Sequence, residues 1–409
     1  MPLLRSSRLL LLLALAGAGL AGWARAATWA SPATGRDLTL QVLEPTAVPA
    51  GEAPVSVVFY LQNLAAPRVG TESDDAILSD LRAAGHLVVV LDYARHPAST
   101  VPAIYPDLIR LREDVRAKRL LADRRVDPAR LYLVPAGCRL RRDVVFFRDA
   151  TRTLALDVIY PARPAQPVGA VLEFSCDNEN RMGNFSLTFC TDALLPAAAI
   201  EGFAAAMADH PVAAPYKGLD AMPDAAHKAK AAVRTLRALA SELGLNGRIV
   251  PAGFSRGSGM ALLLATTTGR AEFEQHGENP TVSSAVQGAV VMSGRFTYLD
   301  LRPDDAMIPR YVKAWGERST HEAVWRAHGA LDYLSAPTAP LFLTINVTES
   351  PDALHQMEVL RRRLKELGSP FAYHPETEPR GHRMPLDPAV LTPLFAYLHA
   401  RLTPPLTAP

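Results

Sequence analysis

The Gly-Phe-Ser-Arg-Gly run at 253–257 constrains what this chain can fold into more than any other segment. An apolar strand pattern leads into it at 247–252, and small and aliphatic residues typical of a helix follow at 258–265. Glycines two positions before and after Ser255 permit a tight, strained turn, because a side chain at either place would collide with neighbouring backbone. The run therefore predicts a strand–turn–helix unit that points the Ser255 hydroxyl away from the sheet. It also places the next backbone N–H at a helix start, where an oxyanion can bind.

Strands and helices alternate through the C-terminal two-thirds of the chain. The strand-like runs are 154–160, 170–174, 202–207, 249–252, 289–292 and 341–347. Helical patterns separate them, among them 225–243 and 356–367. This alternation predicts a mostly parallel sheet with helices on both faces and with the site-forming loops at the carboxyl ends of the strands.

Residues 37–140 partly repeat this pattern. The run Val-Pro-Ala-Gly occurs at 134–137 and again at 250–253. Earlier landmarks match in pairs at nearly equal spacing: Pro45 and Pro161, Phe59 and Phe174, Pro97 and Pro211. The first copy continues with Cys138-Arg139-Leu140 and has no serine, which predicts a degenerate half-module without a nucleophile. The alternative is that any two β-α-β-α-β units share such spacing, because loop lengths in these folds are narrow.

A serine hydroxyl needs a base, usually a histidine held by a carboxylate, before it can act as a nucleophile at neutral pH. We assign His382 as this base, because it lies in a loop between the strand-like run 371–374 and the last helical pattern, 388–402. Gly381 before it permits a tight turn. The alternative is a surface-loop histidine. His374 lies within the strand pattern itself and fits the role poorly.

With these motifs, residues 150–405 resemble the α/β-hydrolase superfamily, and in particular its esterase and dienelactone-hydrolase-like serine hydrolases. The resemblance implies an α/β-hydrolase fold and a triad in the chain order serine, acid, histidine. Counting back from the helical run 358–367 places Glu349 at the family's acid position. Asp352 requires a shift of three residues but carries the commoner residue type, so it is the alternative acid. Either carboxylate could instead serve only to stabilise a helix N-terminus.

Two departures from the family pattern lie near the expected oxyanion site. The family's His-Gly-Gly motif is replaced by Phe-Ser-Cys-Asp-Asn at 174–178, so we expect the second oxyanion N–H from about Cys176 or Asp177. The first would come from the backbone of Arg256. Arginines that follow the nucleophile help hold the oxyanion in the glucuronoyl-esterase branch, but the glycine spacing differs here. A surface ion pair is the alternative for the Arg256 side chain.

An insertion of nearly fifty residues separates the strand-like runs that end at 292 and begin at 341. We expect it to cover the serine as a lid at about 295–337. Its aromatic residues include Tyr298, Tyr311, Trp315, Trp325 and Tyr333. They form either a pocket for an acyl group or a sugar, or the insertion's own core. The polar run 177–184 suits a carbohydrate or carboxylate ligand, and suits an ordinary solvated loop equally.

The first 26 residues have the pattern of a secretory signal peptide. Arg5 and Arg8 precede an apolar stretch from residue 9 to about 22, and Ala24-Arg25-Ala26 fits small-x-small cleavage. This predicts a secreted or periplasmic protein with a mature start near Ala27. The alternative is an uncleaved anchor, although the apolar core is short for a membrane span.

Export would make a disulfide permissible, and the chain has three cysteines. Cys176 and Cys190 flank the polar run and are the better candidates for a pair. Cys138 would then remain, in a buried position. Three unpaired cysteines are the alternative.

Composition excludes several classes of function. The 409 residues are 49% apolar and 21% charged, with a net charge of +2 and no long block of one sign. We therefore expect no nucleic-acid partner and no anionic membrane surface as partner. Paired metal-ligand motifs, a phosphate-binding glycine loop and a dinucleotide fingerprint are all absent from the sequence, so we expect no metal and no cofactor.

The sequence thus predicts three segments: a signal peptide at 1–26, an α/β module without a nucleophile at 27–140, and an α/β-hydrolase domain at 141–409. The predicted activity is hydrolysis of a carboxylic ester, of a small molecule or an acylated carbohydrate, through an acyl-enzyme. Two alternatives stay open. One is a prolyl-oligopeptidase-like peptidase on the same core, and the other is a non-catalytic binding protein on a hydrolase scaffold.

Overall fold

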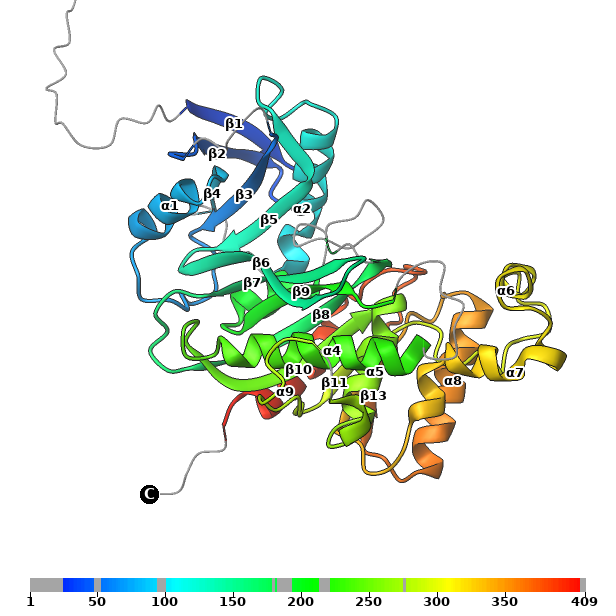
Figure 1. The fold of residues 1–409 in the computed structure, drawn as a ribbon. Coiled ribbons are helices and arrows are strands. Elements are labelled where there is room, and N and C mark those ends of the chain that lie inside the picture. Colours follow the sequence, from blue (N-terminus) through cyan, green and yellow to red (C-terminus); the bar gives the residue numbers. More distant parts are fainter. Residues whose placement is uncertain are drawn as a thin grey trace, which may run out of the picture.

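The strands of this protein divide between two sheets that follow one another along the chain (Figure 1). The structure is a computed structural model, and it describes residues 25–47, 53–93, 101–178, 181, 193–212, 221–274 and 277–404. Residues 1–24 of the predicted signal peptide lie outside this range. The first strand, β1 (Arg25–Ser31), begins before the predicted cleavage point, so a mature start at Ala27 would retain most of it.

The second sheet contains eight strands in the order β13-β12-β11-β10-β8-β9-β7-β6. They are β6 (Cys138–Arg148), β7 (Thr153–Pro161), β8 (Val168–Asn178), β9 (Ala204–His210), β10 (Leu245–Phe254), β11 (Ala289–Met292), β12 (Leu341–Thr344) and β13 (Phe371–Tyr373). Only β7 runs antiparallel to its neighbours β6 and β9, and the remaining pairs are parallel. The strands expected from the sequence are confirmed, with boundaries that move by up to four residues.

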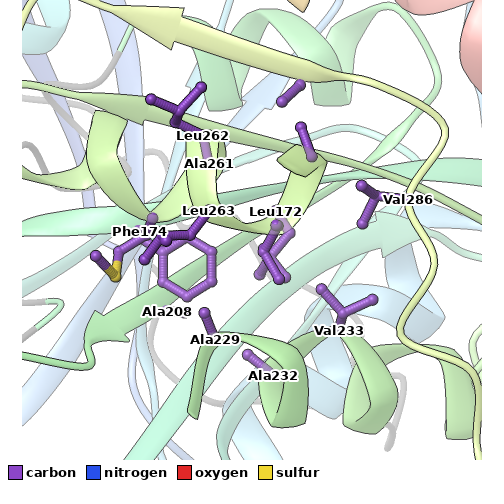
Figure 2. Packing of buried hydrophobic residues seen from close by; sticks show 14 of the residues in the cluster. Leu172, Phe174, Ala208, Ala229, Ala232, Val233, Ala261, Leu262, Leu263 and Val286 are labelled. Atoms are coloured by element: carbon purple, nitrogen blue, oxygen red, sulfur yellow. The ribbon is translucent and has the colours of Figure 1, made fainter. Parts of the chain in front are cut away.

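Helices cover both faces of this sheet. They are α3 (Leu194–Ile200), α4 (Ala221–Ala238), α5 (Arg256–Thr266), α8 (Pro351–Glu366) and α9 (Pro388–Leu402). Because successive side chains of a strand point to opposite faces, Leu172 and Phe174 of β8 join one core with α4, α5 and α8, while Val171 joins another with α3 and α9. Figure 2 shows the first core, where alanines of α4 and aliphatic residues of α5 pack on β8.

The first sheet contains five strands in the order β1-β2-β4-β3-β5. The remaining strands are β2 (Arg36–Leu43), β3 (Val55–Gln62), β4 (Leu87–Asp92) and β5 (Val126–Pro135), and the helices are α1 (Asp74–Ala83) and α2 (Val101–Arg116). β1 pairs antiparallel with β2, β2 pairs antiparallel with β4, and the pairs β3–β4 and β3–β5 are parallel. The half of the second sheet formed by β6-β7-β9-β8-β10 has the same order and the same pairing senses.

The register of the third strand differs from the sequence expectation. Leu61 pairs with Pro135 in the first sheet, and Leu172 pairs with Pro251 in the second. If the two prolines are equivalent, Leu61 matches Leu172, and the predicted match of Phe59 with Phe174 is wrong by four residues. A shift of four preserves which face each side chain occupies, so the apolar pattern alone could not detect it. Pro97, another predicted landmark, lies outside the described residues.

The two sheets share a core. Val58 and Tyr60 of β3 and Val134 of β5 belong to the same buried cluster as α3, α9 and one face of the second sheet. Gly137, with φ +83°, turns the chain directly from β5 into β6. The predicted boundary between residues 140 and 141 therefore falls inside β6, because Cys138-Arg139-Leu140 begins a strand rather than a turn and helix.

The insertion between β11 and β12 contains α6 (Ile308–Trp315), α7 (Arg318–Ala327) and the short 3₁₀ helix η2 (Ala330–Tyr333). A second 3₁₀ helix, η1 (Ala271–Phe273), lies between α5 and β11. Helices α6 and α7 lie at the periphery, far from the first sheet (Figure 1). Among the described helices, none combines the length and the apolar composition needed to span a bilayer.

Candidate active site

The turn between β10 and α5 holds Ser255 in a strained conformation. Its φ is +54° and its ψ is −118°, outside the regions that a non-glycine residue normally occupies. A Cβ on Gly253 would lie 2.1 Å from the Gly257 carbonyl oxygen, and one on Gly257 would lie 2.2 Å from that of Phe174. Neither contact is tolerable, so both glycines are required, as the sequence predicts. The Ser255 N–H donates to the Met292 carbonyl at 3.1 Å, which ties the turn to β11.

His382 reaches Ser255 from the loop between β13 and α9. Its Nε2 lies 3.0 Å from the Ser255 Oγ. The ring packs against Phe254, with the two ring centroids 4.6 Å apart. Gly381, at φ +64°, makes the turn before it. The structure thus brings the predicted nucleophile and base into hydrogen-bond contact across 127 residues of sequence.

Glu349 lies on the other side of the imidazole. The His382 Nδ1 lies 2.8 Å from one Glu349 oxygen and 2.9 Å from the other, and the Glu349 residue is only 6% exposed. The alternative acid, Asp352, does not reach the histidine. It lies in the first turn of α8, 3.7 Å from Arg295 and 3.5 Å from Arg302. Burial, followed by the nearby Asp305, raises the pKa of Asp352.

Ser293 was not identified from the sequence, yet it contacts the triad. It follows β11 directly, is buried, and has a φ of +46°. Its hydroxyl donates to Glu349 at 2.9 Å and lies 3.5 Å from the His382 Nδ1. A Ser-Gly pair after a buried strand next to the nucleophile strand was the available signal. The Ser293 hydroxyl satisfies a lone pair of Glu349 and so helps fix the carboxylate beside the histidine.

His210 contacts the turn from the end of β9, and it was not identified from the sequence. Its Nδ1 accepts a hydrogen bond from the Val212 N–H at 3.1 Å, so its proton is on Nε2 and is donated to the Arg256 carbonyl at 3.2 Å. Burial, with a contribution from the nearby Arg256 charge, lowers the pKa of His210 to about 3. His210 is therefore a neutral donor that holds the first peptide of α5.

The predicted oxyanion donors lie at the ends of α5 and β8. Arg256 is the first residue of α5, where backbone N–H groups have no partner within the helix. Cys176 lies next to the turn, with its Sγ 3.0 Å from the Phe254 carbonyl. The second oxyanion N–H, from Cys176 or Asp177, stays a prediction. Cys190 lies outside the described residues, and its pairing with Cys176 is likewise untested.

Most of the polar run after β8 lies outside the described residues, but Arg181 is described. It is buried and forms ion pairs with Asp157 at 2.9 Å, with Asp209 at 3.1 Å and with Asp143. These contacts anchor the segment that follows β8 to β7, to β9 and to a bulge in β6. Arg181 is thus fully engaged by acidic residues of the protein itself.

Four aromatic residues of the insertion pack on each other. Tyr298 lies edge-on to Tyr311 and Trp315, with centroids 5.1 and 4.9 Å apart, and Trp315 lies edge-on to Trp325 at 5.4 Å. Tyr333 is separate and packs against Phe273. The four-residue cluster forms a core for the insertion. Arg256 is near enough to oppose the burial that raises the pKa of Tyr298, so the base of the insertion adjoins the nucleophile turn.

Metal binding finds no support in the described part of the chain, where no three His, Cys, Asp or Glu side chains are grouped to hold an ion. Cys138 is buried, and burial raises the pKa of its thiol to about 12, so it is an inert core residue.

No protein-family model matches this sequence, and no curated protein sequence matches it. Among solved structures, a truncated carbohydrate esterase from gut microbiota is 16% identical over 64% of this chain and 95% of that chain, with a TM-score of 0.51. The bifunctional GH43-CE protein of Bacteroides eggerthii is 17% identical over 64% of this chain and 38% of its own, with a TM-score of 0.52. The esterase Est2 of Thermogutta terrifontis is 20% identical over 67% and 97%, with a TM-score of 0.48.

The first two of these likenesses, with TM-scores above 0.5, concern the fold alone. The chain has the α/β-hydrolase fold, with a mostly parallel sheet flanked by helices, as the sequence predicts.

Proposed function

We propose that this chain is a serine hydrolase of carboxylic esters, with Ser255 as nucleophile, His382 as base and Glu349 as the acid that orients the histidine. The observation that carries the proposal is the continuous hydrogen-bonded path from Ser255 Oγ through both ring nitrogens of His382 to a buried carboxylate. An ordinary serine in a β–α turn has no reason to be held at φ +54° facing an imidazole.

In the first step, the Ser255 Oγ attacks the ester carbonyl carbon while His382 takes the hydroxyl proton. The carbonyl π electrons move to the oxygen, and the backbone N–H of Arg256 and a donor near Cys176 stabilise that oxyanion. When the intermediate collapses, the bond to the alcohol oxygen breaks and the proton on His382 passes to the leaving alcohol. Glu349 stays ionised and stabilises the imidazolium.

In the second step, water attacks the acyl-enzyme. His382 takes a proton from the water as the water oxygen bonds to the acyl carbon. Collapse of this second intermediate returns the proton to the Ser255 oxygen and releases a carboxylic acid. The reaction consumes one ester and one water and yields one alcohol and one acid. It requires no metal or redox group, since the side chains named above supply every proton transfer.

An acylated carbohydrate is the substrate class we propose first. Two of the structural neighbours are described as carbohydrate esterase and GH43-CE proteins. The segment after β8 also contains a concentration of polar residues, at 177–184. Together with the signal-peptide pattern at 1–26, this favours a secreted or periplasmic enzyme that acts on small-molecule or carbohydrate esters.

A fluorophosphonate probe and a substrate panel test the proposal. The wild-type chain should be labelled at Ser255 and should hydrolyse p-nitrophenyl acetate and acetylated sugars, and Ser255→Ala should do neither. Hydrolysis of aminoacyl-proline substrates in place of esters would favour the peptidase. If the wild-type chain shows neither labelling nor turnover, the scaffold is a non-catalytic binding protein.

A further inference from the structure

Two buried polar side chains join the loop that carries Glu349 to the loop that carries His382. Asn346 lies three residues before Glu349, and Glu376 lies six residues before His382. Asn346 is 3% exposed and Glu376 is 1% exposed. The Asn346 Nδ2 donates to the Glu376 carboxylate at 2.9 Å. The Asn346 backbone also contacts the acid residue, since its carbonyl accepts from the Glu349 N–H at 3.1 Å.

The backbone of the two loops is paired at the same place. The Glu376 N–H donates to the Ile345 carbonyl at 3.0 Å, and the Val347 N–H donates to the Glu376 carbonyl at 2.9 Å. This isolated parallel bridge extends the β12–β13 pairing past the ends of both strands. The side-chain contact therefore lies at the last point where the two loops run side by side.

The amide of Asn346 also fixes the loop on the histidine side. Its Nδ2 donates to the Glu378 carbonyl at 2.6 Å, and its Oδ1 accepts from the Thr348 hydroxyl at 2.7 Å. The same Thr348 oxygen accepts from the Gly381 N–H at 3.0 Å. A short chain of hydrogen bonds thus leads from Asn346 to the residue immediately before His382.

Glu376, at the start of the loop that carries His382, also binds the end of that loop. One of its oxygens accepts from the backbone N–H groups of Leu386 and Asp387, at 2.9 and 3.2 Å, just before α9 begins. The other oxygen accepts from Asn346. One carboxylate therefore joins the two ends of the loop to each other and to the acid turn. The Arg380 Nε lies 4.0 Å from the carboxylate, so the shorter hydrogen bonds rather than this ion pair define its orientation.

We propose that Asn346 and Glu376 are positioning residues for the triad, acting together to set His382 relative to Glu349 and Ser255. This inference rests on the proposed serine hydrolase function. It has a clear physical basis, because a misplacement of about 1 Å in a catalytic group can lower turnover about a hundredfold. Because the pair contacts the loops that carry Glu349 and His382, we expect its effect in kcat rather than in KM.

The test exchanges the donor and the acceptor. Glu376→Gln alone places an amide NH₂ against the Asn346 NH₂ or against the two backbone N–H groups, and Asn346→Asp alone places two carboxylates in contact. Each single variant should lower kcat on p-nitrophenyl acetate by between about tenfold and a hundredfold, with KM within about twofold of wild type. The double variant restores one donor–acceptor pair and should recover part of the lost kcat. Losses that simply multiply in the double variant overturn the coupling.

A matched control distinguishes a loss of kcat caused by displaced triad residues from one caused by a less stable fold. Asp107 is a buried carboxylate in the first sheet's half of the molecule, and it accepts from Ser31, Tyr93 and the Ala33 N–H. Asp107→Asn should lower the melting temperature while leaving kcat within about twofold. If Asp107→Asn loses as much kcat as Glu376→Gln at equal melting temperature, the effect is one of stability and the proposal fails.

Two further measurements keep the test decisive. If the single variants do not fold, Thr348 offers a second test, because this residue is exposed. Thr348→Val removes the hydroxyl that accepts from the Gly381 N–H and should lower kcat about three- to fivefold. An unchanged kcat overturns the inference. A crystal structure of Glu376→Gln should show the His382–Ser255 distance lengthened beyond 3.0 Å. An unchanged distance overturns the positioning role. A wild-type chain without esterase turnover instead overturns the proposed function, and the crystallographic distance still decides the inference.

Discussion

The first sheet and the β6–β10 half of the second sheet have the same strand order and the same pairing senses. The chain continues differently, however, after the last strand of each. After β10, the chain makes the Ser255 turn, enters α5 and adds three more parallel strands. After β5, it turns at Gly137 and becomes the edge strand β6 of the next sheet. The loops that bring Glu349 and His382 to the serine follow β12 and precede α9, and the first sheet has no counterpart of either. The proposed triad therefore requires the strands beyond the turn, which the second sheet alone adds.

The largest expected contrast is between Ser255 and Arg139, which occupy matching places after the two Val-Pro-Ala-Gly runs. Ser255→Ala should lower kcat by at least about 10⁴-fold, because no other group can form the acyl-enzyme. Arg139→Ala removes a two-pronged ion pair with Glu72 at 2.8 Å and should leave kcat within about twofold. Steady-state kinetics on p-nitrophenyl acetate checks both variants. Loss of turnover in Arg139→Ala would show that the first module contributes to catalysis.

The next contrast concerns the acid, which lies in the part of the chain that the first sheet lacks. Glu349→Gln should lower kcat by about 10³- to 10⁴-fold, because the amide cannot stabilise the imidazolium that forms at His382. Asp352→Asn should change kcat less than about threefold, since its neighbours are Arg295 and Arg302 rather than the histidine. The two rates are measured on the same ester. Equal losses would contradict the assignment of Glu349.

Two buried histidines whose pKa is lowered by burial lie one in each half of the molecule, His86 and His210, and of these two His210 contacts the turn that holds Ser255. His210 donates to the Arg256 carbonyl, whereas His86 in the first half lies 2.7 Å from the Ser56 hydroxyl. We expect His210→Phe to lower kcat about tenfold, because the first peptide of α5 loses its support. His210→Gln keeps a donor at the same distance along the side chain and should restore most of this activity. His86→Phe should leave kcat unchanged. A lower kcat in this variant would contradict the view that only the second half supports the turn that holds Ser255.

The smallest expected effect is on stability against pH, and it should be shared by both halves. Burial lowers the pKa of His86 and of His210 to about 3, against an ordinary value of about 6.5 in an unfolded chain. Between these values the unfolded chain binds more protons, so stability is complete above about pH 6.5 and declines as the pH falls toward 3. Each histidine contributes a slope of about 1.4 kcal/mol per pH unit.

Urea unfolding between pH 4 and pH 7 measures this slope. His86→Gln and His210→Gln should each make the loss of stability on acidification less steep than in the wild-type chain. A variant with an unaltered slope would mean that its histidine is already protonated, or exposed, in the folded state.

Much of the fold could be predicted because it is encoded locally. Strand and helix positions follow from apolar periodicity, and the need for Gly253 and Gly257 follows from the width of one turn. The third-strand match of Phe59 with Phe174 was wrong because a shift of four residues preserves the pattern of faces. The two-sheet arrangement with a shared core was not predicted either, since it depends on which faces of distant strands meet.

The sequence by itself determined the turn that holds Ser255 and the order in which Ser255, Glu349 and His382 occur, and it predicted His382 as the base, because each depends on a short segment or on chain order. Only the tertiary structure decided between Glu349 and Asp352, since three residues of loop separate a carboxylate that reaches His382 from one that pairs with arginines. It alone brought in Ser293, His210 and the Asn346–Glu376 pair. These contacts join segments 30 to 89 residues apart. Their geometry depends on how the loops meet at the edge of the sheet, and a local sequence pattern cannot predict that.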